Sequence, residues 1–335
     1  MNSPLRTVLL ILAVMLMGWP ATYGQKTATL KVSQRLDQVL RWLPTDCETL
    51  VVLNGPLKTP RKAPQAPEFL VSAQLFFFFG IANLLPEGLL PKQPHGPKVV
   101  MAVDASRRFT APKGLGMMEF EDCQILFFNA SAHDAVETAL KTWIEKSPKT
   151  IQIGDTKVAV FAEKGQNDKR PLLVARAQRG VLLCANNRKF LEQVLARMKR
   201  KNPDRAFPDS LPEWRHVDME APMWGMRHYR KGFADRDPSS PLGPQAGANV
   251  ADPKAVGLVF SLEAKPEIAK VRYLSGAKDA VRIVRRGWNN PGEKLTPKIH
   301  EMKPGVIEIT TPTQGRTGTV FLLVLMGYLG HGIYM

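Results

Sequence analysis

The chain has 335 residues, a formal net charge of +16, and 44% hydrophobic residues. This apolar content excludes a wholly disordered chain, and the length predicts about two domains of ~150 residues each. The cysteines form no Cys-x-x-Cys pair, which argues against a zinc ribbon or a redox motif.

The first 24 residues have the pattern of an export signal. Arg6 provides a positive start, Thr7 to Trp19 is an uninterrupted apolar run, and Pro20 ends it ahead of small residues. The run is shorter than the ~20 residues that cross a bilayer, so we expect a removable signal rather than a membrane anchor. Cleavage after Gly24 would remove one base and no acid.

Export changes how the basic charge is interpreted. Inside a cell, nucleic acid would be the first partner to consider. Outside it, the available polyanions are lipid headgroups and acidic polymers of the envelope or matrix, which attract a basic protein through salt-screened fields. We therefore expect a periplasmic, envelope-associated or secreted protein with an anionic partner and no nucleic acid. A charge that serves only solubility is the alternative.

The N-terminal part of the mature chain predicts a helix and then a strand. The helix begins at Ser33 and carries apolar residues at spacings of three and four, and the strand covers 49–53. A proline-rich connection at 56–68 follows. Phe69 to Leu85 is strongly apolar, and we expect it to form a buried helix, with a membrane-dipping or partner-binding surface as the alternative.

Three weakly repeated units, each a strand, a polar cap and an amphipathic helix, occupy the middle of the chain. Their strands begin near Gln124, Gly180 and Lys270. Further strands are expected in pairs around them: Lys157–Phe161, Leu172–Arg176 and Gly257–Leu262. This order predicts an α+β fold, in which antiparallel sheets of paired strands carry amphipathic helices packed on one face.

A cluster of prolines after residue 202 places the expected domain boundary at 205/206. We expect an α+β domain at 25–205 and a second one at 206–335. Residues 231–254 are rich in Pro, Gly, Ser and Asp and predict a long flexible loop in the second domain. The apolar end, 320–335, predicts a buried terminal strand or short helix, with a membrane anchor as the alternative.

Two basic helices are the first candidate binding site. Each combines an apolar stripe, which a sheet would cover, with a charged side that can meet an anionic polymer or lipid. The first helix contributes Arg188, Lys189, Arg197, Arg200 and Lys201, and the second contributes Arg282, Arg285 and Arg286. An ordinary solvated helix face is the alternative interpretation.

A metal site is the second candidate. If residues 214–220 form a strand, His216, Asp218 and Glu220 point to one face, where an imidazole and two carboxylates can ligate a divalent metal. The motif lacks the fixed spacing of known metal motifs, and a solvated strand face explains it as well.

These patterns favour an exported, non-enzymatic binding protein without a cofactor. The alternative is a metal-dependent hydrolase centred on His216, Asp218 and Glu220. Cys123 and Cys184 lie in apolar strand segments and are expected to be buried. A disulfide among Cys47, Cys123 and Cys184 is permitted by an oxidising compartment but is not required by the sequence.

Overall fold

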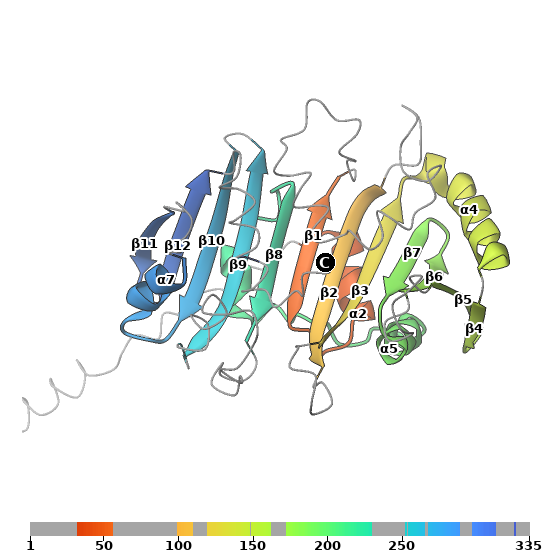
Figure 1. The fold of residues 1–335 in the computed structure, drawn as a ribbon, viewed down its shortest axis with the longest axis horizontal. Coiled ribbons are helices and arrows are strands. Elements are labelled where there is room, and N and C mark those ends of the chain that lie inside the picture. The colour runs from red at the N-terminus through yellow and green to blue at the C-terminus, as the bar shows by residue number, and fades with distance from the viewer. Residues whose placement is uncertain are drawn as a thin grey trace, which may run out of the picture. The chain divides into compact units, whose positions relative to one another are not determined.

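Apolar strand segments, several of them buried along nearly their whole length, build one large antiparallel sheet (Figure 1). The computed structural model describes residues 32–55, 99–109, 119–147, 149–161, 172–229, 252, 254–264, 267–288, 297–312 and 325. Its strands are β1 (Thr49–Asn54), β2 (Val99–Phe109), β3 (Glu119–Phe128), β4 (Lys149–Ile153), β5 (Thr156–Phe161), β6 (Leu172–Gln178), β7 (Val181–Ala185), β8 (Met223–His228), β9 (Ala255–Ala264), β10 (Glu267–Ser275), β11 (Lys298–Lys303) and β12 (Val306–Pro312). They lie in the order β11-β12-β10-β9-β8-β1-β2-β3-β7-β6-β5-β4.

The helices with described bounds are fewer than the strands. They are α2 (Gln34–Trp42), α4 (His133–Lys146), α5 (Arg188–Met198) and α7 (Ala280–Trp288), together with the 3₁₀ helices η1 (Ala130–Ala132) and η2 (Pro212–His216).

The centre of the sheet is apolar on both faces. On β1, Val51 and Leu53 point to one side, here called the first face, and Leu50 and Val52 point to the other, the second face. All four side chains are buried. Each face therefore needs its own cover.

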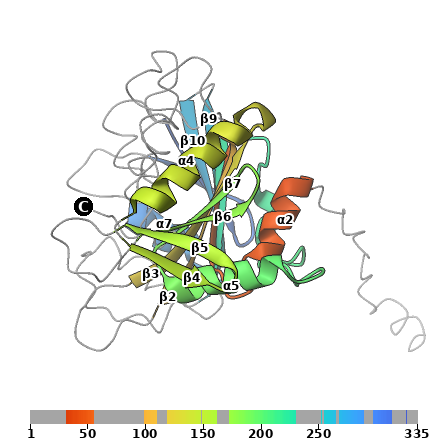
Figure 2. The same cartoon turned by 90° about the vertical axis from the view of Figure 1, so that its right-hand side faces the viewer.

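Helices lie on both faces of the sheet (Figure 2). Val136 of α4 and Val284 of α7 pack into the core cluster of the first face, which contains Val51. On the second face, Trp42 of α2 stacks on Phe127 of β3, with ring centroids 6.1 Å apart. Helix α5 contacts α2, β3 and β7, so it lies on the second face as well.

The expected fold class is therefore wrong. The fold is mainly β: a single sheet of twelve described strands dominates it, and helices are not packed along one face as an α+β layout requires. Local periodicity had correctly indicated several strands and helices. It could not show that every strand joins the same sheet, because that depends on pairings between distant segments.

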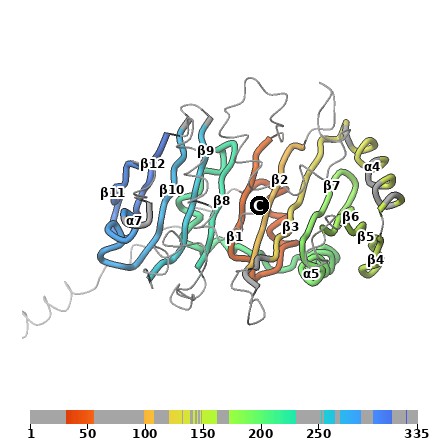
Figure 3. The backbone as a smooth tube through the Cα atoms, in the orientation of Figure 1, coloured from red at the N-terminus to blue at the C-terminus, as the bar shows by residue number. Residues whose placement is uncertain are grey.

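Two strands that are distant in the sequence pair in the middle of this sheet. β1 pairs with β8, with Val52 opposite Trp224, although about 170 residues separate them (Figure 3). On one side of this junction, β1, β2 and β3 form a meander followed by α4, and on the other, β8, β9 and β10 form a meander followed by α7. The expected boundary at 205/206 falls between these similar halves, and the sheet continues across it.

Several expected segments fall outside the described residues. These are the signal at 1–24, the apolar segment 69–85, most of the loop 231–254, and the C-terminal run 320–335 except Leu325. Leu325 is fully buried in the core of the first face. Among the described residues, none of the helices has the length and hydropathy that a membrane span requires.

Candidate functional site

Helix α5 is built as the sequence predicted. The side-chain Oδ1 of Asn187 accepts a hydrogen bond from the backbone N–H of Phe190 at 3.1 Å, which caps the start of the helix. Phe190, Leu191 and Val194 form a fully buried stripe against the second face. This stripe fixes which side of α5 faces solvent.

The solvent side of α5 and the turn after it carry five exposed basic residues. We call them the α5 basic surface: Arg188, Lys189, Lys199, Arg200 and Lys201. Arg188 forms an ion pair with Glu192 at 2.7 Å, one helical turn away, and Glu192 is the only acid between residues 188 and 201. Lys199 forms an ion pair with Asp155 in the β4–β5 turn. A hydrogen bond from Lys199 lowers the pKa of the exposed Asp155 carboxyl.

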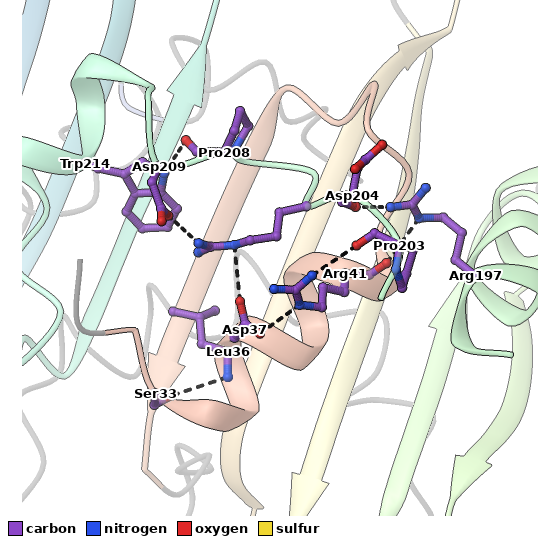
Figure 4. A network of polar contacts seen from close by, with 11 residues as sticks. Ser33, Leu36, Asp37, Arg41, Arg197, Pro203, Asp204, Pro208, Asp209 and Trp214 are labelled. Carbon is purple, nitrogen blue, oxygen red and sulfur yellow. Dashed lines mark hydrogen bonds and ion pairs between the residues drawn. The ribbon is translucent and has the colours of Figure 1, made fainter. Parts of the chain in front are cut away.

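Arg197 has a different role from its neighbours. Its Nε donates to the backbone carbonyl of Arg41 at 3.2 Å, and its Nη2 donates to the carbonyl of Asp204 (Figure 4). Burial and the nearby charge of Arg200 lower the pKa of the Arg197 guanidinium. Arg197 thus joins α5 to α2 and to the following loop, and it is not available to an external partner.

The loop after α5 is held to α2 by further charged contacts (Figure 4). Asp37 of α2 accepts from Arg41 at 2.9 Å and forms an ion pair with Arg205 at 3.3 Å. The Nη1 of Arg41 also donates to the carbonyl of Pro203 at 3.3 Å. Further along, the indole of Trp214 donates to the carbonyl of Pro208 at 3.1 Å. This network fixes the C-terminal end of α5 and leaves Arg200 and Lys201 exposed.

The second predicted basic helix, α7, does not join the α5 basic surface. α7 packs on the first face through Ala280 and Val284, whereas α5 lies on the second. Arg282 and Arg285 are exposed, and Arg282 forms an ion pair with Asp279. The side chain of Arg286 lies outside the described part. The predicted binding residues with described, exposed side chains therefore lie on two separate surfaces, with Arg188, Lys189, Arg200 and Lys201 on α5 and the turn after it and Arg282 and Arg285 on α7.

Residues 214–220 do not form the strand that the metal-site hypothesis requires. Residues Pro212–His216 form η2, and a turn follows in which Asp218 Oδ1 accepts from the backbone N–H of Glu220 at 3.1 Å. His216, Asp218 and Glu220 therefore do not share a strand face, which removes the geometric basis of the predicted metal site. No group of three or more His, Cys, Asp or Glu side chains able to hold a metal occurs in the part of the chain that the structure describes.

The charge around His216 also disfavours a cation there. Burial lowers the pKa of this imidazole, and the charges of Lys303, Arg272 and Arg215 lower it further. The carbonyl of His216 accepts from Arg272 Nη1 at 2.9 Å. His216 is thus a half-buried imidazole beside three bases.

Sequence reasoning missed the pairing of a buried carboxylate with a histidine. Glu213 of η2 is completely buried, and its Oε1 lies 2.8 Å from Nδ1 of His228 on β8. Glu213 Oε2 has no hydrogen-bond partner among the described residues. The contact joins η2 to the second face of the sheet. There was little indication of this contact in the sequence, because Glu213 and His228 are fifteen residues apart and no spacing rule connects them.

Cys47, Cys123 and Cys184 all belong to the described residues; all three are buried, and no disulfide joins them. The expected burial of Cys123 and Cys184 is confirmed. Cys184 lies opposite Gln124 in the β3–β7 pairing, so it points to the other face of the sheet from Cys123. Burial raises the pKa of both thiols.

The chain matches no protein-family model, and it matches no curated protein. Among solved structures it is similar to crystal forms I and III of TP0453, at 12% and 10% sequence identity and with TM-scores of 0.46 and 0.48. In both cases 85% of this chain and 97% of the TP0453 chain are covered. Similarity of this degree supports no statement about what this chain does.

Proposed function

We propose that this is an exported, non-enzymatic binding protein that attaches to an anionic polymer of the cell envelope or matrix through the α5 basic surface. The observation that carries the proposal is the combination of exposed charge and buried apolar stripe on α5. Five basic side chains face solvent there, while Phe190, Leu191 and Val194 are sealed against the sheet. Export itself rests on the signal pattern of residues 1–24.

The buried stripe favours a polymer over a lipid bilayer. A helix that binds a membrane in its interfacial plane inserts its apolar side among the acyl chains. In α5 that side contacts the sheet and is not available, so only the charges reach a partner. A flexible polyanion needs only charge, and it can follow the exposed side of the helix.

Equilibrium binding to a linear anionic polysaccharide, polygalacturonate, tests this proposal against neutral dextran of similar length. Vesicles of phosphatidylglycerol and phosphatidylcholine form a second arm. The proposal expects saturable binding to polygalacturonate that weakens steeply with salt, and none to dextran. Binding to the vesicles alone would show a lipid partner and overturn the assignment to a polymer. Periplasmic or extracellular recovery of a chain lacking its first ~24 residues would support export.

A further inference from the structure

A second basic surface lies on the other face of the sheet. Lys278, Arg282 and Arg285 are exposed on α7 and the turn before it, and we call them the α7 basic surface. Asp279 is the one acid between residues 278 and 286, and it pairs with Arg282. The apolar side of α7 is also occupied, because Ala280 and Val284 are buried in the core of the first face.

The two surfaces are too far apart to act as one. Helix α5 contacts β3, and α7 contacts β12. These strands are separated by β2, β1, β8, β9 and β10 in the sheet order, a lateral distance of about 30 Å at the usual strand spacing. The helices also lie on opposite faces. The Debye length at physiological salt is about 8 Å, so an anionic segment on one surface does not feel the charges of the other.

We propose that the protein bridges two anionic polymer chains, one bound to the α5 basic surface and one to the α7 basic surface. This inference rests on the proposed function, because it takes the same class of partner. A segment lying on one surface cannot reach the other without passing around an edge of the sheet. Two chains, or two distant segments of a long one, are thus held together by one rigid sheet.

Bridging has a consequence that single-site binding lacks. A protein with two independent sites cross-links long polymers, and the cross-linking passes through a maximum as the protein concentration rises. When protein is in excess, each protein molecule binds one polymer chain through one of its surfaces, and the cross-links between chains are lost. Light scattering from mixtures of the purified protein with long polygalacturonate reports this maximum directly.

Matched variants assign the two sites. One variant carries Arg200→Gln and Lys201→Gln on the α5 basic surface, and another carries Lys278→Gln and Arg285→Gln on α7. The control carries Lys141→Gln and Lys157→Gln, which remove the same charge from exposed positions on α4 and β5. With a short oligogalacturonate, calorimetry should give two bound oligomers per protein for the wild type and control. At oligomer concentrations that fill only the unaltered surface it should give one for each surface variant, because the affinity at the altered surface is lower by roughly 10- to 30-fold.

The outcomes separate this inference from the proposed function. A scattering maximum in the wild type and control, reduced at least fivefold in both surface variants, supports bridging. Saturable binding with one oligomer per protein and no scattering maximum would overturn bridging and leave the proposed function intact. An unchanged stoichiometry in the α7 variant would show that α7 is not a site and would also overturn the inference. No binding of either polymer form by the wild type would overturn both proposals.

Discussion

The backbone of Gly257 lies directly against the buried carboxylate of Glu213. A Cβ atom at position 257 would lie only 1.9 Å from Glu213 Oε1 and 2.7 Å from the carbonyl oxygen of Arg227. Because residue 257 of β9 is a glycine, η2 can pack against the sheet with the Glu213 carboxylate in contact with His228. Both contacts are fixed, because Glu213 is fully buried and Arg227 O is backbone.

Gly257→Ala should therefore destabilise the protein by about 3 kcal/mol, since an added methyl group has no room without a shift of η2 or of β8. Urea unfolding followed by tryptophan fluorescence measures this difference. Gly276→Ala is the matched control, because the nearest atom to its Cβ is 3.7 Å away. Its effect should stay within about 0.5 kcal/mol. Equal effects of the two substitutions would contradict the described packing of η2.

Arg107 on β2 should contribute far more to stability than the exposed arginines of α5. Its Nε donates to Glu121 and its Nη1 donates to Asp46, both at 2.6 Å, and its guanidinium lies over the ring of Phe190 at 4.8 Å from the centroid. Because Glu121 is buried, Arg107→Met leaves a buried carboxylate without its cation and should cost about 3–5 kcal/mol of unfolding free energy.

Arg188→Met is the comparison for Arg107→Met. Arg188 is exposed, and among the described residues its ion pair is with Glu192 across one helical turn, so its loss should cost about 0.5 kcal/mol or less. Chemical denaturation of both variants under the same conditions gives the two values. A cost for Arg107→Met as small as that for Arg188→Met would show that the contacts of Arg107 are not maintained in solution.

Stability should fall when the pH drops below the ordinary pKa of histidine, in part because of His216. Burial and three neighbouring bases lower the pKa of His216 in the folded state, so the unfolded chain binds its proton first. Above pH ~6.5 the imidazole is neutral in both states, and the free energy of unfolding keeps its full value with respect to His216. As the pH falls below that value, the unfolded chain takes up the proton first and the free energy of unfolding decreases. His216→Gln should remove this part of the pH dependence in urea titrations between pH 7.5 and 5. An identical pH profile in the variant would refute the assignment.

The thiols should be inert in the folded protein. Burial raises the pKa of Cys123 and Cys184, so both stay protonated well above neutral pH, and the thiolate is the reactive form. Cys47 is buried too. Treatment with a chromogenic disulfide reagent at pH 8 should give no rapid reaction in buffer and three thiols after unfolding in guanidinium. Fewer than three thiols after unfolding under non-reducing conditions would reveal a disulfide instead.

Local patterns in the sequence predicted several elements well. The helix expected from Ser33 is α2, where the Ser33 hydroxyl accepts from the backbone N–H of Leu36 at 3.3 Å. The strand at 49–53 is β1, and the strand near 181–184 with its asparagine-capped helix is β7 followed by α5. These elements could be predicted because apolar spacing and capping residues determine helices and strands through interactions within a few positions of the chain.

The fold class and the metal candidate required information that is not local. The alternation of Trp214 to Glu220 resembles a strand, but Trp214 packs edge-on against Trp224 and Asp218 closes a turn with its side chain. Aspartate side chains that bond to nearby backbone N–H groups, as Asp218 does, compete with sheet formation for those backbone hydrogen bonds. The β1–β8 pairing joins distant segments, and no spacing rule predicts it. The lateral separation of the two basic helices, which contact β3 and β12, follows from the same sheet order.

The most direct test of the central claim is the salt dependence of binding to polygalacturonate. The slope of log Kd against log salt concentration should be steep for the wild type and for the control with Lys141→Gln and Lys157→Gln. It should be clearly shallower for Arg200→Gln with Lys201→Gln, because fewer charges then contact the polymer. An equal slope and affinity in all three proteins, or no binding by the wild type at low salt, would contradict a role for the α5 basic surface in holding an anionic polymer.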